Sequence, residues 1–75
     1  MNADRRNRLR AAKSKLEIVR DDIAGICNEE DECRSNMPEN LAGSERYERS
    51  EECSDMMDAA IASIDDAIGS IEEAI

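Results

Sequence analysis

The apolar positions near the C-terminus recur at alternating spacings of three and four residues. Residues 60–75 read Ala-Ile-x-Ser-Ile-acid-acid twice in full, followed by the first two residues of a third unit. This spacing is typical of the seam of a coiled coil, with the acidic pairs on the opposite side of the helix. The repeat therefore predicts a long amphipathic helix over 44–75, with its isoleucines buried against other helices.

A second heptad pattern occupies the first half of the chain and runs from Leu9 to Met37, interrupted by the charged Glu30. It predicts a first helix over 4–35. Ile18 and Cys27 lie beside this seam and widen the apolar face, which favours a bundle over a two-stranded coiled coil. The positions expected to form the core or an oligomer seam are Leu9, Leu16, Val19, Ile23, Ile26, Met57, Ile61, Ile64, Ile68 and Ile71.

The first half of the second helix has a weaker seam, because Ser50 and Ser54 stand where apolar residues are expected. Cys53, Met56 and Ala60 lie beside these serines. We expect a slight rotation of the helix to let these three residues compensate for the serines in the core.

A break between the two patterns predicts a hairpin. Pro38 prevents the first helix from continuing, which places a turn over 36–43. Ser44 is a good N-cap for the second helix, and Asn2 or Asp4 can cap the first. Two helices of matched length around one central break predict an all-α fold, an antiparallel two-helix hairpin in a single domain.

The small size of the chain makes association with another chain attractive. Its 75 residues include no Phe, no Trp and one Tyr, so the core of one hairpin must be thin. We expect a homodimer that completes a four-helix bundle. The alternative is a hairpin that buries the same apolar face on a different protein. Disorder would also suit so charged a chain, but the sustained apolar periodicity argues against it.

The net charge of −9 is distributed unevenly along the chain. Residues 1–20 carry seven basic and two acidic side chains, whereas residues 21–75 carry three basic and seventeen acidic ones. If the chain doubles back, the basic end lies beside the acids of the C-terminal repeat, and opposite charges along the seam favour the antiparallel arrangement. We expect no direct binding of nucleic acid, since phosphates would be repelled over most of the surface. A nucleic-acid patch at the basic end is a weaker alternative.

The residue types leave little scope for catalysis or metal binding. The chain has no histidine, and its three cysteines show no CxxC spacing, so we expect neither a metal site nor a cofactor. Exposed carboxylates on a two-helix scaffold lack the enclosing pocket that shifts pKa values, which argues against an enzyme. No stretch reads as a signal peptide or a membrane span, and cytoplasmic residence with reduced thiols is the expectation.

Acidic residues are concentrated near the turn, where no basic stretch of the first helix can neutralise them. One interpretation is a solvated outer face that keeps the bundle soluble. The other is an array of carboxylates that docks on a basic groove in the way that nucleic-acid phosphates do. The residues expected to form this partner-binding acidic face are Glu29, Glu30, Asp31, Glu32, Glu45, Glu48, Glu51, Glu52, Asp55 and Asp58.

Residues 36–75 resemble a known group of small acidic helical proteins encoded by phages and prophages of Gram-positive bacteria. The resemblance rests on the segment Asn-Met-Pro-Glu-Asn-Leu at 36–41, on Ser-Glu-Arg-Tyr-Glu at 44–48, and on the acidic heptads after them. The group has no established activity. The resemblance implies a phage setting, in which proteins of this size and charge are often effectors that bind one host protein, including inhibitors of defence nucleases.

Two functions follow from these patterns as hypotheses. The first is a non-enzymatic acidic module that occupies the basic groove of a host or defence nucleic-acid-binding protein and so inhibits it. The second is a self-assembling structural bundle whose acids confer only solubility. The expected partner is a protein with a basic surface in the first case and a second copy of the chain in both.

Overall fold

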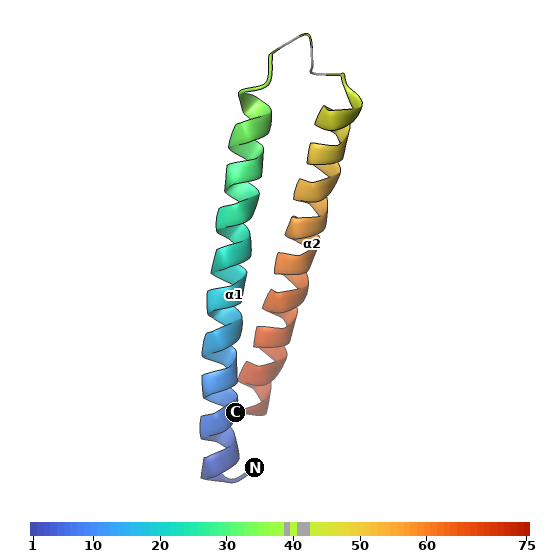
Figure 1. Ribbon diagram of the computed structural model, residues 1–75. Coiled ribbons are helices and arrows are strands. Elements are labelled where there is room, and N and C mark those ends of the chain that lie inside the picture. The colour runs from blue at the N-terminus through green and yellow to red at the C-terminus, as the bar shows by residue number, and fades with distance from the viewer. Residues whose placement is uncertain (39, 41–42) are drawn as a thin grey trace.

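Two long helices make up the fold in the computed structural model, which describes residues 1–38, 40 and 43–75. Helix α1 spans Ala3–Ser35 and helix α2 spans Glu45–Ala74. The helices run antiparallel and lie side by side, with both termini at one end of the molecule, the open end (Figure 1). The molecule is elongated, with principal-axis extents of 60 × 14 × 12 Å. The predicted all-α hairpin is therefore confirmed.

The N-termini of both helices carry the caps that the sequence predicts. The Oδ1 atom of Asn2 accepts a hydrogen bond from the backbone N–H of Arg5 at 2.8 Å. The Oγ atom of Ser44 accepts one from the backbone N–H of Tyr47 at 3.2 Å. These bonds satisfy backbone donors that have no partner within the helix. The turn predicted over 36–43 lies partly outside the described residues.

Helix α2 presents its predicted seam to α1. Ile68 is 7% exposed, and Ser50 and Ser54 are each 5% exposed. The expected rotation of α2 is wrong, because the two serines are buried and Met56 is 62% exposed. The other seam residues of α2 are half-buried: Tyr47, Met57, Ile61, Ile64, Ile71 and Ile75.

Helix α1 meets α2 through a face that is rotated from the predicted one. Leu9, Leu16 and Ile23 are half-buried, as expected of seam residues. Val19 and Ile26 are 45% and 55% exposed, so the prediction that they contribute to the core is wrong for the hairpin itself. At every second position of the seam, the residue of α1 that contacts α2 is the one directly after the predicted residue.

Four residues of α1 fill the shifted positions: Lys13, Arg20, Cys27 and Arg34. Cys27 is buried and the three basic side chains are half-buried. A basic group is tolerated in a seam only where polar partners surround it. Helix α2 supplies such partners as carboxylates along one edge and as serine hydroxyls near the turn. If Val19 and Ile26 occupied the seam instead, these carboxylates and hydroxyls of α2 would have no partner on α1. The shifted seam is therefore the one that satisfies the polar groups of both helices.

Two ion pairs join the helices in the half of the hairpin near the open end. The Nζ atom of Lys13 lies 3.1 Å from an Oε1 of Glu72, and Nη1 of Arg20 lies 3.0 Å from Oδ1 of Asp65. All four side chains remain partly exposed, so each pair contributes little to the free energy of folding. Together they confirm that the basic end pairs with acids of the C-terminal repeat, and they select the antiparallel register.

The hydrophobic core of the hairpin is thin. Within the described residues, Cys27 and Ile68 are the buried apolar side chains, and none is less than 2% exposed. Ile18 and Met56 are each 62% exposed. The two helices thus leave a large part of their apolar surface in contact with water.

Candidate functional site

The acidic residues predicted to bind a partner lie around the turn half of the hairpin, and most of them face solvent. Glu30 and Asp31 are half-buried. The other eight are exposed: Glu29, Glu32, Glu45, Glu48, Glu51, Glu52, Asp55 and Asp58. We call these ten residues the acidic surface.

The turn half of the hairpin carries almost all of the excess negative charge. Residues 21–64 contain thirteen acidic and three basic side chains, a net charge of −10. Residues 1–20 together with 65–75 contain seven basic and six acidic side chains, a net charge of +1. The Arg20–Asp65 ion pair marks the level at which the two halves meet. The negative potential of the protein is therefore concentrated at one end.

The acidic surface is divided between two sides of the hairpin. Glu29 and Glu32 belong to the side of α1 that faces away from α2, because the seam passes through Cys27 and Arg34. Glu48 and Asp55 belong to the side of α2 that faces away from α1. The structure thus keeps these outward-facing acids of the two helices apart, whereas Asp31 and Asp58 lie between them at the contact of the helices. A single flat partner would contact only one of the outward-facing groups.

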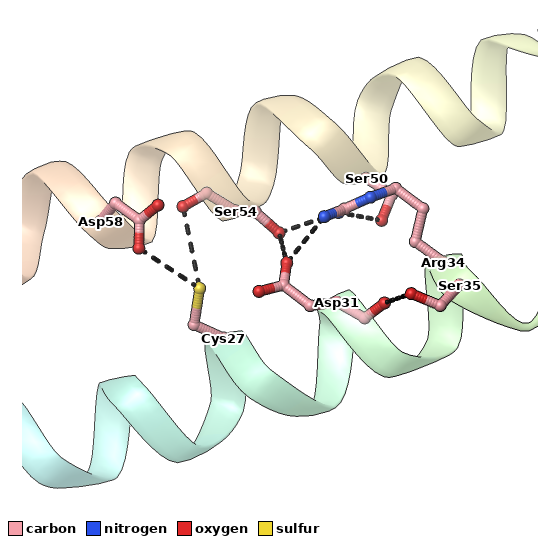
Figure 2. Close-up of polar contacts among 7 residues, drawn as sticks. All are labelled: Cys27, Asp31, Arg34, Ser35, Ser50, Ser54 and Asp58. Atoms are coloured by element: carbon pink, nitrogen blue, oxygen red, sulfur yellow. Dashed lines mark hydrogen bonds and ion pairs between the residues drawn. The ribbon is translucent and has the colours of Figure 1, made fainter.

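Beneath the acidic surface, a group of polar side chains joins the two helices inside the seam (Figure 2). The guanidinium group of Arg34 donates to the Oγ of Ser50 at 3.1 Å and to the Oγ of Ser54 at 2.9 Å. Its Nη2 atom lies 2.7 Å from Oδ1 of Asp31. Ser54 in turn donates to the same Asp31 oxygen at 2.7 Å. We call Asp31, Arg34, Ser50 and Ser54 the polar seam.

The polar seam is electrostatically satisfied. The hydrogen bond from Ser54, together with the bond from Arg34 and its charge, lowers the pKa of Asp31 from its ordinary value. The hydrogen bond with Asp31 raises the pKa of Arg34 above its ordinary value. Asp31 is therefore held in its charged form and bonds within the hairpin, which makes it a structural residue more than a member of the acidic surface.

Cys27 extends this polar region toward the middle of the hairpin. Its Sγ lies 3.9 Å from the backbone oxygen of Ser54 and 3.6 Å from Oδ1 of Asp58. Figure 2 marks both contacts with dashed lines. Burial, followed by the charges of Asp31 and Asp58, raises the pKa of the Cys27 thiol. The thiol is therefore kept protonated and shielded, and it functions as a packing group at this position.

The heptad pattern predicts Ser50 and Ser54 in the seam, and the structure places both there, but the pattern gives no role to their hydroxyl groups. Their partners were visible in the sequence as Asp31 and Arg34, three residues apart on α1, at the level that an antiparallel hairpin places beside the serines. The signal lies in the match between polar positions of the two helices and not in either helix alone. Hydrophobic periodicity alone scores a serine or an arginine in a seam as an error.

The described residues contain no group of three or more His, Cys, Asp or Glu side chains that could hold a metal ion. Within the same residues, no helix is long and apolar enough to cross a membrane. What the acidic surface offers chemically is a set of charged hydrogen-bond acceptors, which suit the guanidinium and ammonium groups of a basic partner.

Comparison with known proteins adds no assignment: no protein-family model, curated protein or solved structure matches the chain. The functional argument therefore depends on the arrangement of the side chains.

Proposed function

We propose that the protein is a non-enzymatic, acidic helical module that binds a protein with a basic surface. The observation that supports it is the net charge of −10 over residues 21–64, displayed mainly by exposed carboxylates. Only three basic residues lie in this half, and two of them are engaged: Arg34 inside the polar seam and Arg49 with Glu52 at 3.2 Å. The exposed carboxylates of the acidic surface can attract a cationic partner at long range.

The partner that this surface suits best is a nucleic-acid-binding protein. Such proteins present grooves of Lys and Arg side chains that are spaced to neutralise phosphates. The rod-like hairpin, with acids on each side of its turn end, would compete with the phosphate backbone for such a groove. In the phage setting suggested by the sequence, this activity would inhibit a host or defence protein in the cytoplasm, a CRISPR nuclease being one example.

Affinity capture from lysate of a bacterial host, with the protein immobilised, tests the proposal. A specific partner should be retained at low salt and released as the salt concentration rises to about 1 M, because the attraction is screened. The purified partner should lose its binding to nucleic acid when the hairpin is added. Reversing Glu48, Glu51, Glu52 and Asp55 to Lys together should abolish both capture and competition.

A variant of equal charge change provides the control. Reversing Asp4, Asp22, Asp66 and Glu73 to Lys alters the net charge by the same amount, but three of its four changes lie in the open half. This variant should retain the partner. Equal loss in both variants would indicate non-specific charge attraction, and retention in the first variant would show that the acidic surface does not bind the partner.

The exposed apolar residues favour a second function, self-assembly into a structural bundle. The quaternary structure that we propose is a homodimer in which two hairpins complete a four-helix bundle. In this function the carboxylates keep the assembly soluble and no basic partner is needed. Two results together would favour this second function. The protein would be dimeric in solution, and the capture experiment would return no partner whose nucleic-acid binding the hairpin inhibits.

A further inference from the structure

The two edges of the hairpin differ sharply in chemistry. One edge carries the Lys13–Glu72 and Arg20–Asp65 ion pairs and the contact of Cys27 with Asp58. The opposite edge is formed by the residues that directly precede every second seam residue, from Lys13 to Arg34 in α1 and from Ser54 to Ile75 in α2. On α1 these are Ala12, Val19, Ile26 and Cys33, and on α2 they are Cys53 and three alanines spaced by seven residues. We call this opposite edge the apolar strip.

The apolar strip runs along most of the hairpin without a single charged side chain. Val19 and Ile26 lie at its centre and are 45% and 55% exposed. Ala60, Ala67 and Ala74 are also exposed. Because alanine side chains are short, another helix can approach α2 closely at these positions. A continuous, uncharged strip is unusual on a protein in which 39% of the residues are charged. Exposed apolar patches of this kind mark interaction sites.

The hairpin exposes more surface than an average folded monomer of its mass, and the excess is close to the area that a dimer would bury on each copy. Folded monomers of this mass expose about 4,600 Å² on average. This chain exposes 5504 Å², an excess of roughly 900 Å². A stable protein–protein interface of standard size buries about 800 Å² on each partner. A second copy of the chain can therefore restore the burial that a two-helix core does not supply.

The charge of the two halves determines how a second copy must be oriented. The turn half carries −10 and the half at the open end carries +1. If two hairpins aligned their turn ends, the two halves of charge −10 would lie side by side and repel each other. In the reversed orientation, each negative half lies beside the nearly neutral half of the other copy.

We propose that two copies pack strip against strip with their turn ends at opposite ends of the dimer. The two-fold axis then passes midway between Val19 and Ile26, so α1 of one copy lies antiparallel to α1 of the other. Val19 of each copy packs against Ile26 of the second copy, and Lys15 lies within one residue of the level of Glu29 of the second copy. This proposal specifies the surface and orientation of the homodimer proposed above, and it does not depend on a basic partner.

A pair of isoleucine substitutions on α1 tests the surface. Ile26→Lys places a charge in the centre of the strip, twice in a symmetric dimer, and should raise the dissociation constant of the dimer by at least about 100-fold. Ile18→Lys makes the same chemical change at a residue that is 62% exposed and lies outside the strip. It should leave the dimer intact. Helix content measured by circular dichroism confirms that both variants keep their helices.

The mass in solution, measured by analytical ultracentrifugation at several concentrations, gives the result. The wild type should have twice the 8.4 kDa mass of one chain, and so should Ile18→Lys, whereas Ile26→Lys should be a monomer. A wild type that stays monomeric at about 100 µM would overturn both the homodimer and this proposal. A dimer that survives Ile26→Lys would leave the homodimer standing but overturn the strip as its interface.

Cross-linking determines the orientation. A carbodiimide joins lysine to carboxylate without a spacer, and mixing isotope-labelled with unlabelled protein separates links between copies from links within one copy. The proposal predicts a link between Lys15 and Glu29 of different copies. Links from Lys15 to Asp66 or Glu73 of the second copy would instead show that the turn ends lie together, and would overturn the orientation.

Discussion

The Nη1 atom of Arg34 lies 2.9 Å from the Oγ of Ser54, so a basic side chain of α1 is bonded to a buried hydroxyl of α2 within the seam. This relationship places a charged side chain of α1 beside two buried serines of α2 in the half of the hairpin near the turn. If α2 slipped by one heptad, Arg34 would face Met57 in place of Ser50, and Asp31 would face Ile61 in place of Ser54. Because the Arg34 side chain is only 18% exposed, leaving its charge without a polar partner is unfavourable, and the polar seam therefore favours a single register.

Removal of the Ser54 hydroxyl should weaken the hairpin. Ser54→Ala deletes an acceptor for Arg34 and a donor to Asp31, so the free energy of unfolding should fall by about 1 kcal/mol. The melting temperature should fall by about 4–8 °C in a domain of this size. Thermal melts at one protein concentration, followed by circular dichroism, measure the change.

Ser63→Ala is the matched control, because Ser63 is an exposed serine of the same helix. Its melting temperature should stay close to that of the wild type. Equal melting temperatures for Ser54→Ala and Ser63→Ala would show that the polar seam does not stabilise the fold.

The contribution of Asp31 should depend on pH in one direction. The pKa of Asp31 is lowered in the folded protein because hydrogen bonds stabilise its carboxylate there. The charged form of Asp31 therefore favours the folded state over the unfolded chain. Its stabilisation is fully present above the pKa of an unfolded aspartate, about 4, and is lost as the pH falls through the lowered folded-state pKa. The difference in melting temperature between wild type and Asp31→Asn should therefore be constant above about pH 5 and shrink toward pH 2.

Comparing each variant with the wild type at the same pH removes the effect of the overall charge. Glu32→Gln removes an exposed carboxylate one residue further along the chain and should cause little loss of stability at neutral pH. A difference for Asp31→Asn that is as large at pH 2 as at pH 7 would contradict the assigned charged state of Asp31.

The three cysteines should react with iodoacetamide in an order set by their environments. Cys33 is exposed, Cys53 is half-buried, and Cys27 is buried with a raised thiol pKa. Since the thiolate is the reactive form, Cys27 should be alkylated at least about 10-fold more slowly than Cys33. Peptide mapping by mass spectrometry after timed labelling measures each rate.

The Ile26→Lys variant should be labelled in parallel, because Cys33 and Cys53 lie on the apolar strip and a dimer would shield them. In this variant the order Cys33, Cys53, Cys27 should be clearest. Alkylation of Cys27 at the rate of Cys33 in the folded variant would show that the seam around Cys27 is open to solvent.

Substitution of Gly25 by Ala should stabilise the protein. Gly25 lies in the interior of α1 and is exposed, and apart from its chain neighbours and the backbone of its own helix no atom lies within 4 Å of the position that a Cβ would occupy. Alanine lowers the entropy of the unfolded chain without a clash, so the free energy of unfolding should rise by about 1 kcal/mol. Ala62→Gly at an exposed position of α2 is the inverse control and should lower it by a similar amount. A loss of stability in Gly25→Ala would mean that Gly25 has a contact outside the hairpin.

Much of the fold follows from local features of the sequence. The heptads of the C-terminal repeat predict the seam of α2 position by position, because isoleucine spacing alone defines one face of a helix. Ser44 and Asn2 predict the helix starts, since a cap acts within a few residues. The exposure of eight of the ten residues of the acidic surface also follows from the sequence, because a run of carboxylates has few alternatives to solvent.

The seam of α1 could not be read from its own sequence. Its apolar residues cover more than one face, and periodicity cannot decide between Ile26 and the adjacent Cys27 as the seam residue. The decision depends on what α2 places opposite: the hydroxyls of Ser50 and Ser54 near the turn and the carboxylates of Asp65 and Glu72 near the open end.

By itself, the sequence determined that the chain forms two helices, where they begin, that they run antiparallel, and where negative charge accumulates. Only the tertiary structure decided that Arg34 and Cys27 lie inside the seam and that Val19 and Ile26 lie outside it. The physical reason is that a polar group can be buried only where a partner group satisfies it, and that partner belongs to another helix. The same rotation exposes the apolar strip, the uncharged edge that we propose as the surface for a second copy.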